Sequence, residues 1–205
     1  WPGSSAGDQA GHTGPARSTG GTALIPPAVL QQLYVTAEGL LARADIMLND
    51  RDLGLRLTGF DPELNLLRDA CFFLLGVLTG MRCEEIAGIE VGAGRKGRKE
   101  GLVYNWVQSI EHKTKKGRVE YLMPAVGHRV LKVMERWSAP LRQELQSCVL
   151  QLEANHSPVG LPERMRVLAA ARADCNRLFL GRADPDRVRP ALGRPDERLC
   201  RLRRR

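Results

Sequence analysis

The chain has 205 residues, of which 43% are hydrophobic, and this size and composition suit one folded domain with tails. Lysine and arginine (31) outnumber aspartate and glutamate (23), so the net charge of +8 favours an acidic partner, of which nucleic acid is the commonest. The longest apolar run, residues 70–78, is too short to cross a bilayer, and no secretory signal pattern opens the sequence, which argues against a membrane protein.

The first 23 residues are rich in glycine, serine, alanine and threonine, and they carry almost no large apolar groups. Such a segment buries too little surface to offset the entropy of ordering it, so we expect it to be disordered. Pro26 and Pro27 then favour a helix start, and apolar residues follow at helical spacing as far as Leu48. A second helix is predicted from Asp61 and Pro62 to Leu78, because an aspartate before a proline is typical of a helix N-terminus.

Gly80 then permits a tight turn, and residues 84–89 predict one or two further helical turns. Residues 91–101 are rich in glycine, lysine and arginine and are interpreted as a mobile basic loop. Residues 102–110 and 119–123 alternate well enough to predict a β-hairpin, with Gly117 supplying a positive φ in its turn.

The helical period returns after Pro124 and runs to Trp137, and Ser138 with Pro140 predicts the start of a separate helix. A further helix is predicted from Leu161. From Gly181 onward arginine, proline and aspartate dominate, which indicates an unfolded basic tail over residues 181–205. The expected fold class is therefore mainly α with a small antiparallel β-sheet (α+β), in one domain over residues 24–180.

The five cysteines are spread along the chain without any CxxC spacing, at Cys71, Cys83, Cys148, Cys175 and Cys200. We therefore expect reduced, buried thiols in a cytoplasmic protein, with neither disulfides nor a metal site.

Arg82 is the first candidate for chemistry. It lies in the string Thr-Gly-Met-Arg-Cys-Glu-Glu-Ile, directly after an apolar helix. A guanidinium is a planar fork of donors that matches a phosphate, and it stays charged at every working pH. Glu85, three residues later, lies on the same face and could brace it. The plainer interpretation is a capped helix end with a local Arg–Glu pair.

Lys113 is the second candidate, because a lysine on a hairpin can donate a proton to a leaving oxygen. Its basic neighbours are candidate DNA contacts in the turn, at Lys115, Lys116 and Arg118, and in the preceding basic segment, at Arg95, Lys96, Arg98 and Lys99. These charges could equally be solvated. His112 and His128 are interpreted as surface residues, and Tyr34, Tyr104, Tyr121, Trp106 and Trp137 as core residues.

The arginine string and the lysine hairpin, in this order, resemble the first half of the catalytic domain of tyrosine recombinases, the phage integrase family. The resemblance covers roughly residues 60–137. It implies a site-specific recombinase of a mobile element that breaks and rejoins double-stranded DNA through a phosphotyrosyl intermediate, as a tetramer on DNA in the bacterial nucleoid, without metal or cofactor. In that scheme Arg82 contacts the scissile phosphate, Glu85 supports it and Lys113 protonates the leaving group.

The second half of the family pattern is missing. No His-x-x-Arg occurs in the sequence, and the last tyrosine is Tyr121, on the hairpin itself. We therefore expect a chain that is inactive by itself, from a gene that is truncated or frameshifted near Gly181. Reading the neighbouring DNA in its other frames would test this. Two alternatives stay open, a non-catalytic basic DNA-binding protein and a helical interaction module.

Overall fold

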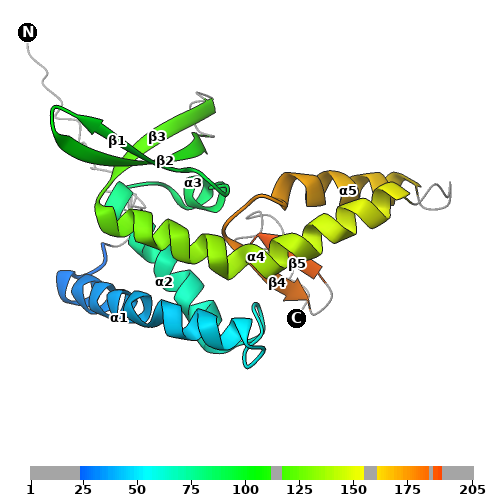
Figure 1. Cartoon of the computed structure of the whole chain (residues 1–205), viewed down its shortest axis with the longest axis horizontal. Helices are drawn as coiled ribbons and strands as arrows, with labels where there is room; N and C mark the ends of the chain where they lie inside the picture. The colour runs from blue at the N-terminus through cyan, green and yellow to red at the C-terminus, as the bar shows by residue number, and fades with distance from the viewer. Residues whose placement is uncertain (1–23, 112–116, 155–160, 185–186, 191–205) are drawn as a thin grey trace, which may run out of the picture.

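The computed structural model describes residues 24–111, 117–154, 161–184 and 187–190. The described chain is mainly helical with a small antiparallel sheet, so the expected α+β class is confirmed at this level. Three long helices form the body of the molecule, with a three-stranded sheet at one end and a helical hairpin reaching out at the other (Figure 1).

The body consists of α1 (Pro27–Asp52), α2 (Pro62–Thr79) and the first half of α4 (Ala125–Ala154), which pack on one another in pairs. The two predicted N-terminal helices are confirmed, and the Asp61 carboxylate caps α2 by accepting hydrogen bonds from the backbone N–H groups of Glu63 and Leu64. Their apolar stripes meet in one core whose largest fully buried members include Leu48, Leu64, Leu67, Leu74, Leu75, Met134, Trp137 and Leu141.

The predicted separate helix at Pro140 is wrong, because α4 continues through that residue. A proline inside a helix removes one backbone donor and pushes against the carbonyl four residues earlier, which for Pro140 is that of Arg136. The buried guanidinium of Arg51, from α1, donates to the carbonyl oxygens of Arg136 (2.8 Å) and Trp137 (3.0 Å). Figure 1 shows α4 bent near its middle. The helix therefore bends there instead of ending, since a neighbouring helix satisfies the carbonyls.

The sheet has the strand order β1 (Gly94–Lys99), β2 (Leu102–Glu111) and β3 (Gly117–Met123), all antiparallel. The predicted hairpin is confirmed as β2 and β3, with Glu111 opposite Gly117 and φ of +77° at Gly117. The predicted mobile basic loop is wrong over residues 94–99, which pair with β2 as an edge strand. Short α3 (Cys83–Ala87) and α4 lie against one face of the sheet (Figure 1).

The helix predicted to start at Leu161 is confirmed as α5 (Leu161–Asp174). It packs against α4, and the chain turns back to the body after it. Leu178 donates its N–H to the carbonyl of Ile89, and Val91 donates to the carbonyl of Asn176, both at 2.9 Å. Phe179 is fully buried against Phe72, with ring centroids 5.3 Å apart. These contacts join the segment after α5 to the segment after α3 and to α2.

The prediction of an unfolded tail is wrong for residues 181–184 and 187–190, because β4 (Leu180–Asp184) and β5 (Arg187–Pro190) form an antiparallel pair. Residues 1–23 and 191–205 lie outside the described part of the chain. Within the described part, no helix has the length and apolar composition needed to cross a membrane.

Candidate nucleic-acid interface

The connection between α2 and α3 positions Arg82. Gly80 ends α2 in the left-handed conformation, with φ of +69°, as the sequence predicted for a tight turn. Thr79 braces the turn through its hydroxyl, which donates to the carbonyl of Leu75 and accepts the N–H of Met81 at 3.2 Å. Since Met81 is itself buried in the core, the backbone that carries Arg82 is held on both sides.

Arg82 is the N-cap of α3, and Glu85 binds it in two ways. One carboxylate oxygen accepts the backbone N–H of Arg82 at 2.7 Å, and the other lies 3.4 Å from a guanidinium nitrogen. The Glu85 side chain is 5% exposed, whereas 54% of the Arg82 side chain is exposed. A buried carboxylate thus contacts a guanidinium whose side chain stays more than half exposed.

The sheet holds α3 in place. Ser109, on β2, is buried and donates its hydroxyl to the carbonyl of Glu85 at 2.5 Å. Gly88, at the end of α3, lies next to this contact. A Cβ at Gly88 would lie 3.3 Å from the carbonyl oxygen of Glu84 and 3.6 Å from the Ser109 hydroxyl oxygen. The arginine site and the hairpin are therefore linked through Ser109, two residues before β2 ends.

The predicted catalytic Lys113 and the candidate contacts Lys115 and Lys116 lie outside the described residues, as does His112. The strands on either side of them are described, and Arg118 is the first of the candidate basic residues after the gap. Its exposed guanidinium donates to Gln108 at 3.5 Å and lies 3.8 Å from the carboxylate of Glu90.

The other candidate DNA contacts share strand β1. Arg95, Lys96, Arg98 and Lys99 are all exposed, and they project alternately to the two faces of the sheet. Gly94 marks the face toward the helices, because a Cβ there would lie 2.9 Å from a methyl group of Leu131 in α4. Lys96 and Arg98 share that face, and Arg95 and Lys99 lie on the opposite, outer face.

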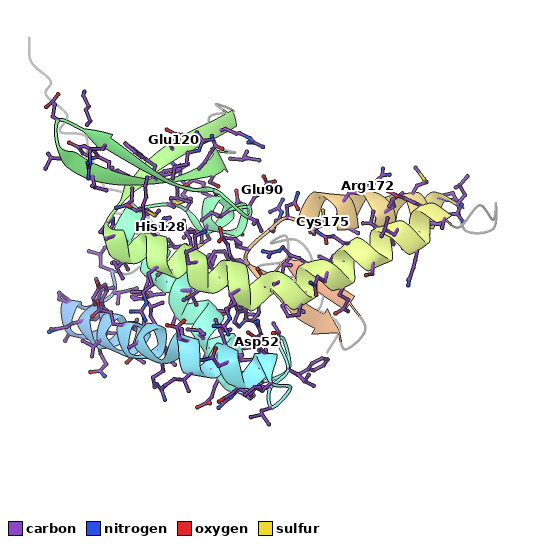
Figure 2. The ribbon with its side chains drawn as sticks, in the orientation of Figure 1. Asp52, Glu90, Glu120, His128, Arg172 and Cys175 are labelled. Atoms are coloured by element: carbon purple, nitrogen blue, oxygen red, sulfur yellow. The ribbon has the colours of Figure 1, made fainter. Side chains whose placement is uncertain are left out.

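A polar hollow of about 190 Å³ lies between the segment after α3 and strands β2 and β3. Its lining includes Glu90, Arg95, Gln108, Ser109 and Arg118. Glu90 lies where the sheet meets the segment after α3, and Glu120 lies on the sheet (Figure 2). Arg82 does not line this hollow, since it lies at the opposite end of α3 from Gly88. The sequence patterns did not point to Glu90 or Gln108, because isolated polar residues carry no spacing signal.

His128 lies on α4 under the sheet (Figure 2), and its buried Nδ1 has no hydrogen-bond partner within the described ranges of the chain. Burial, followed by the nearby charges of Lys96 and Lys132, lowers the pKa of His128. The residue is therefore neutral near pH 7, and it contacts β1 near Gly94 instead of the Arg82 turn.

The structure corrects the predictions for Cys83 and for the pair Tyr104 and Trp106, and it confirms the prediction for Trp137. Cys83 is exposed, contrary to the expected burial of all thiols, because it is the first residue of α3 beside Arg82. Trp137 is fully buried as predicted, and its indole N–H donates to the carbonyl of Leu64 at 2.7 Å. Tyr104 and Trp106 are half-buried on the outer face of the sheet and are not part of the core.

Among the described residues, no three histidine, cysteine, aspartate or glutamate side chains gather in a way that could hold a metal ion. Comparison of the chain with protein-family models, with curated proteins and with solved structures found no match.

Proposed function

We propose that this chain binds double-stranded DNA as the N-terminal part of a catalytic domain of the tyrosine recombinase type. The observation that carries the proposal is the Arg82–Glu85 unit, in which a carboxylate that is 5% exposed holds an arginine that is 54% exposed. An oriented, always charged guanidinium is suited to bidentate contact with a phosphate. It would also stabilise the charge that develops on that phosphate during strand cleavage.

The remaining roles follow from the resemblance in the sequence. Lys113 would give its proton to the oxygen that leaves the phosphorus when a tyrosine oxygen attacks. Lys115, Lys116 and Arg118 would contact neighbouring phosphates. The sequence contains neither a His-x-x-Arg motif nor a tyrosine after Tyr121, so we propose that this chain binds DNA without cleaving it by itself.

A non-catalytic DNA-binding protein is the second candidate, and the four exposed cations of β1 favour it. Such a protein would bind phosphates with the cations of β1 and would not need an oriented arginine at the start of α3. A helical interaction module without a role in nucleic-acid binding fits less well. It would require Arg82 to be both paired and buried, and Arg82 is paired but more than half exposed.

The test compares Arg82→Ala with Arg166→Ala in fluorescence anisotropy on a labelled duplex of about 30 base pairs, in roughly 50 to 200 mM NaCl. Arg166 is a matched control, because it is 74% exposed and pairs with Glu163 at i,i+3 spacing on α5, far along the chain from Arg82. If Arg82 contacts a phosphate, its loss weakens binding about tenfold and lowers the salt slope by about 1.

The outcomes separate the candidates. Equal, small effects of the two substitutions would refute the Arg82 site and leave the non-catalytic DNA-binding protein. Failure of the unaltered protein to bind any duplex would refute both DNA-binding candidates.

A further inference from the structure

The outer face of the three-stranded sheet carries an aromatic pair. Tyr104 and Trp106 are two residues apart on β2, and their rings are stacked with centroids 5.7 Å apart and planes 26° apart. Both side chains are half-buried. The described helices lie against the other face of the sheet, which leaves this pair at the surface (Figure 1).

Gly97 makes room for the pair. It lies opposite Tyr104 on β1, and a Cβ at this position would lie 2.6 Å from the Trp106 ring. The indole therefore lies over the bare backbone of the edge strand. An aromatic ring that covers a strand glycine is held in one orientation, which lowers the entropy lost when a flat ligand stacks on the pair.

Cations surround the aromatic pair on the same face. Arg95 is directly opposite Trp106, and Lys99 is opposite Leu102 at the end of the strand pair. Arg118 is opposite Ile110 on β3. Glu120 lies 3.5 Å from Arg95, and Glu90 lies 3.8 Å from Arg118. Three cations against two carboxylates leave a net positive charge, with Lys99 beside the aromatic pair, and Leu122 adds an apolar side chain that is 58% exposed.

We infer that this face binds unpaired nucleotides of a single-stranded nucleic acid, with bases stacked on Trp106 and Tyr104 and phosphates beside Arg95 and Lys99. Aromatic side chains flanked by cations are the general means of binding single-stranded nucleic acid, because every base can stack on a ring and every phosphodiester linkage carries a negative charge. A second copy of this chain fits less well, since the positive charge of the face would repel a basic chain of net charge +8.

This site is separate from the Arg82 site, because α3 lies against the inner face and the aromatic pair lies on the outer face. The inference therefore goes beyond the proposed duplex binding and stands or falls independently of it.

The test measures anisotropy of labelled oligo-thymidylate and oligo-uridylate with the whole chain and with Trp106→Leu and Tyr104→Ala. Leucine keeps apolar cover over Gly97 and removes the stacking face, so this variant is designed to fold. Phe60→Ala is the matched control, because Phe60 is 51% exposed but lies between α1 and α2. We expect each sheet variant to weaken single-strand binding about tenfold or more and the control to leave it unchanged.

Four further outcomes decide the inference. Binding of one oligonucleotide and not the other supports it and identifies DNA or RNA as the source. Unchanged binding by Trp106→Leu overturns it, and so does failure of the unaltered chain to bind either strand. If Arg82→Ala weakens single-strand binding as much as Trp106→Leu does, single strands use the arginine site, and the separate outer site is refuted.

Discussion

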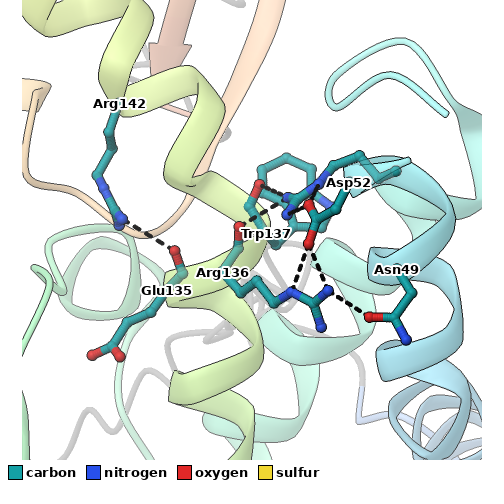
Figure 3. A network of polar contacts seen from close by, with 7 residues as sticks. Asn49, Asp52, Glu135, Arg136, Trp137 and Arg142 are labelled. Atoms are coloured by element: carbon teal, nitrogen blue, oxygen red, sulfur yellow. Dashed lines mark hydrogen bonds and ion pairs between the residues drawn. The ribbon is translucent and has the colours of Figure 1, made fainter. Parts of the chain in front are cut away.

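Arg51 supplies, from α1, the hydrogen-bond donor that Pro140 lacks inside α4. Its Nη1 donates to the carbonyl of Arg136 at 2.8 Å, which is the group that residue 140 would bond if it carried an N–H. The same nitrogen donates to Trp137 at 3.0 Å. Asp52 accepts from both Arg51 and Arg136, and Arg136 also donates to Asn49 at 2.6 Å (Figure 3). The network joins the end of α1 to the bend of α4.

We expect Arg51→Ala to lower the free energy of unfolding by about 2 kcal/mol, because it removes the donor of the Arg136 carbonyl, which has no N–H partner at Pro140. Arg43→Ala, on an exposed position of the same helix, should change it by less than about 0.5 kcal/mol. Urea unfolding followed by circular dichroism measures both values.

The pairing with Pro140 is tested by a double-mutant cycle. Pro140→Ala restores an N–H for the Arg136 carbonyl, so Arg51→Ala should be about 1 kcal/mol less destabilising in that background. If Arg51→Ala is equally destabilising in both backgrounds, Arg51 does not compensate for the proline.

The same network predicts a loss of stability in acid. The hydrogen bonds from Arg136 and then Arg51 lower the pKa of Asp52 from its ordinary value of 3.8. A carboxylate with a lowered folded-state pKa contributes stability that is present above its unfolded value and is lost as pH falls through the folded value. We therefore expect the Asp52 contribution to be constant above about pH 5 and to vanish progressively below about pH 4.

Urea unfolding at a series of pH values would measure this. Asp52→Asn should be less stable than the unaltered chain near pH 7 and should approach it in acid. Asp45→Asn is the control, because the Asp45 carboxylate is 70% exposed and lies 3.8 Å from Arg129. A constant difference between Asp52→Asn and the unaltered chain at every pH would contradict the assignment.

Replacement by alanine should change the stability of the protein in opposite directions at two glycines, Gly94 and Gly39. At Gly94 a Cβ would lie 2.9 Å from a methyl group of Leu131, which is 1% exposed, so Gly94→Ala should cost about 1–2 kcal/mol through overpacking. At Gly39, inside α1, a Cβ meets nothing within 4 Å, so Gly39→Ala should stabilise the helix by about 0.5–1 kcal/mol. Thermal melts measure both, and stabilisation by Gly94→Ala would refute the contact between β1 and α4.

The sequence predicted those elements whose signals are local. The Asp61 cap, the tight turn at Gly80 and the alternating residues of β2 each depend on near neighbours, and each is found as predicted. The helix break at Pro140 was wrong because Arg51, 85 residues from Arg136, supplies the compensating donors. No window of sequence around Pro140 contains that information.

Strand β1 was missed for a related reason. Its sequence, Gly-Arg-Lys-Gly-Arg-Lys, has no alternation of polar and apolar residues, because it is an edge strand whose cations are exposed on both faces. Pairing with β2, and the contacts of Gly94 and Gly97 with Leu131 and Trp106, determine its conformation. The aromatic pair was assigned to the core because alternation shows which residues share a face but not which face is covered.

Cys83 offers a direct test of the proposed DNA contact at Arg82. It is exposed at the start of α3, next to Arg82, whereas Cys71 is fully buried in α2. Burial raises the pKa of the Cys71 thiol to about 12, so this residue should not react with iodoacetamide while the protein is folded. Peptide mapping by mass spectrometry should therefore find Cys83 alkylated at pH 8 and Cys71 alkylated after unfolding.

Duplex DNA at a saturating concentration should slow the alkylation of Cys83 several-fold, because a phosphate backbone held by Arg82 would cover the neighbouring thiol. Cys148 and Cys175, which are half-buried, serve as internal references within the same sample. Oligo-thymidylate bound to the outer face of the sheet should leave the Cys83 rate unchanged, which separates the two proposed sites. If a duplex binds while Cys83 reacts at its free rate, the DNA lies elsewhere, and the exposed cations of β1 become the better candidate for the contact.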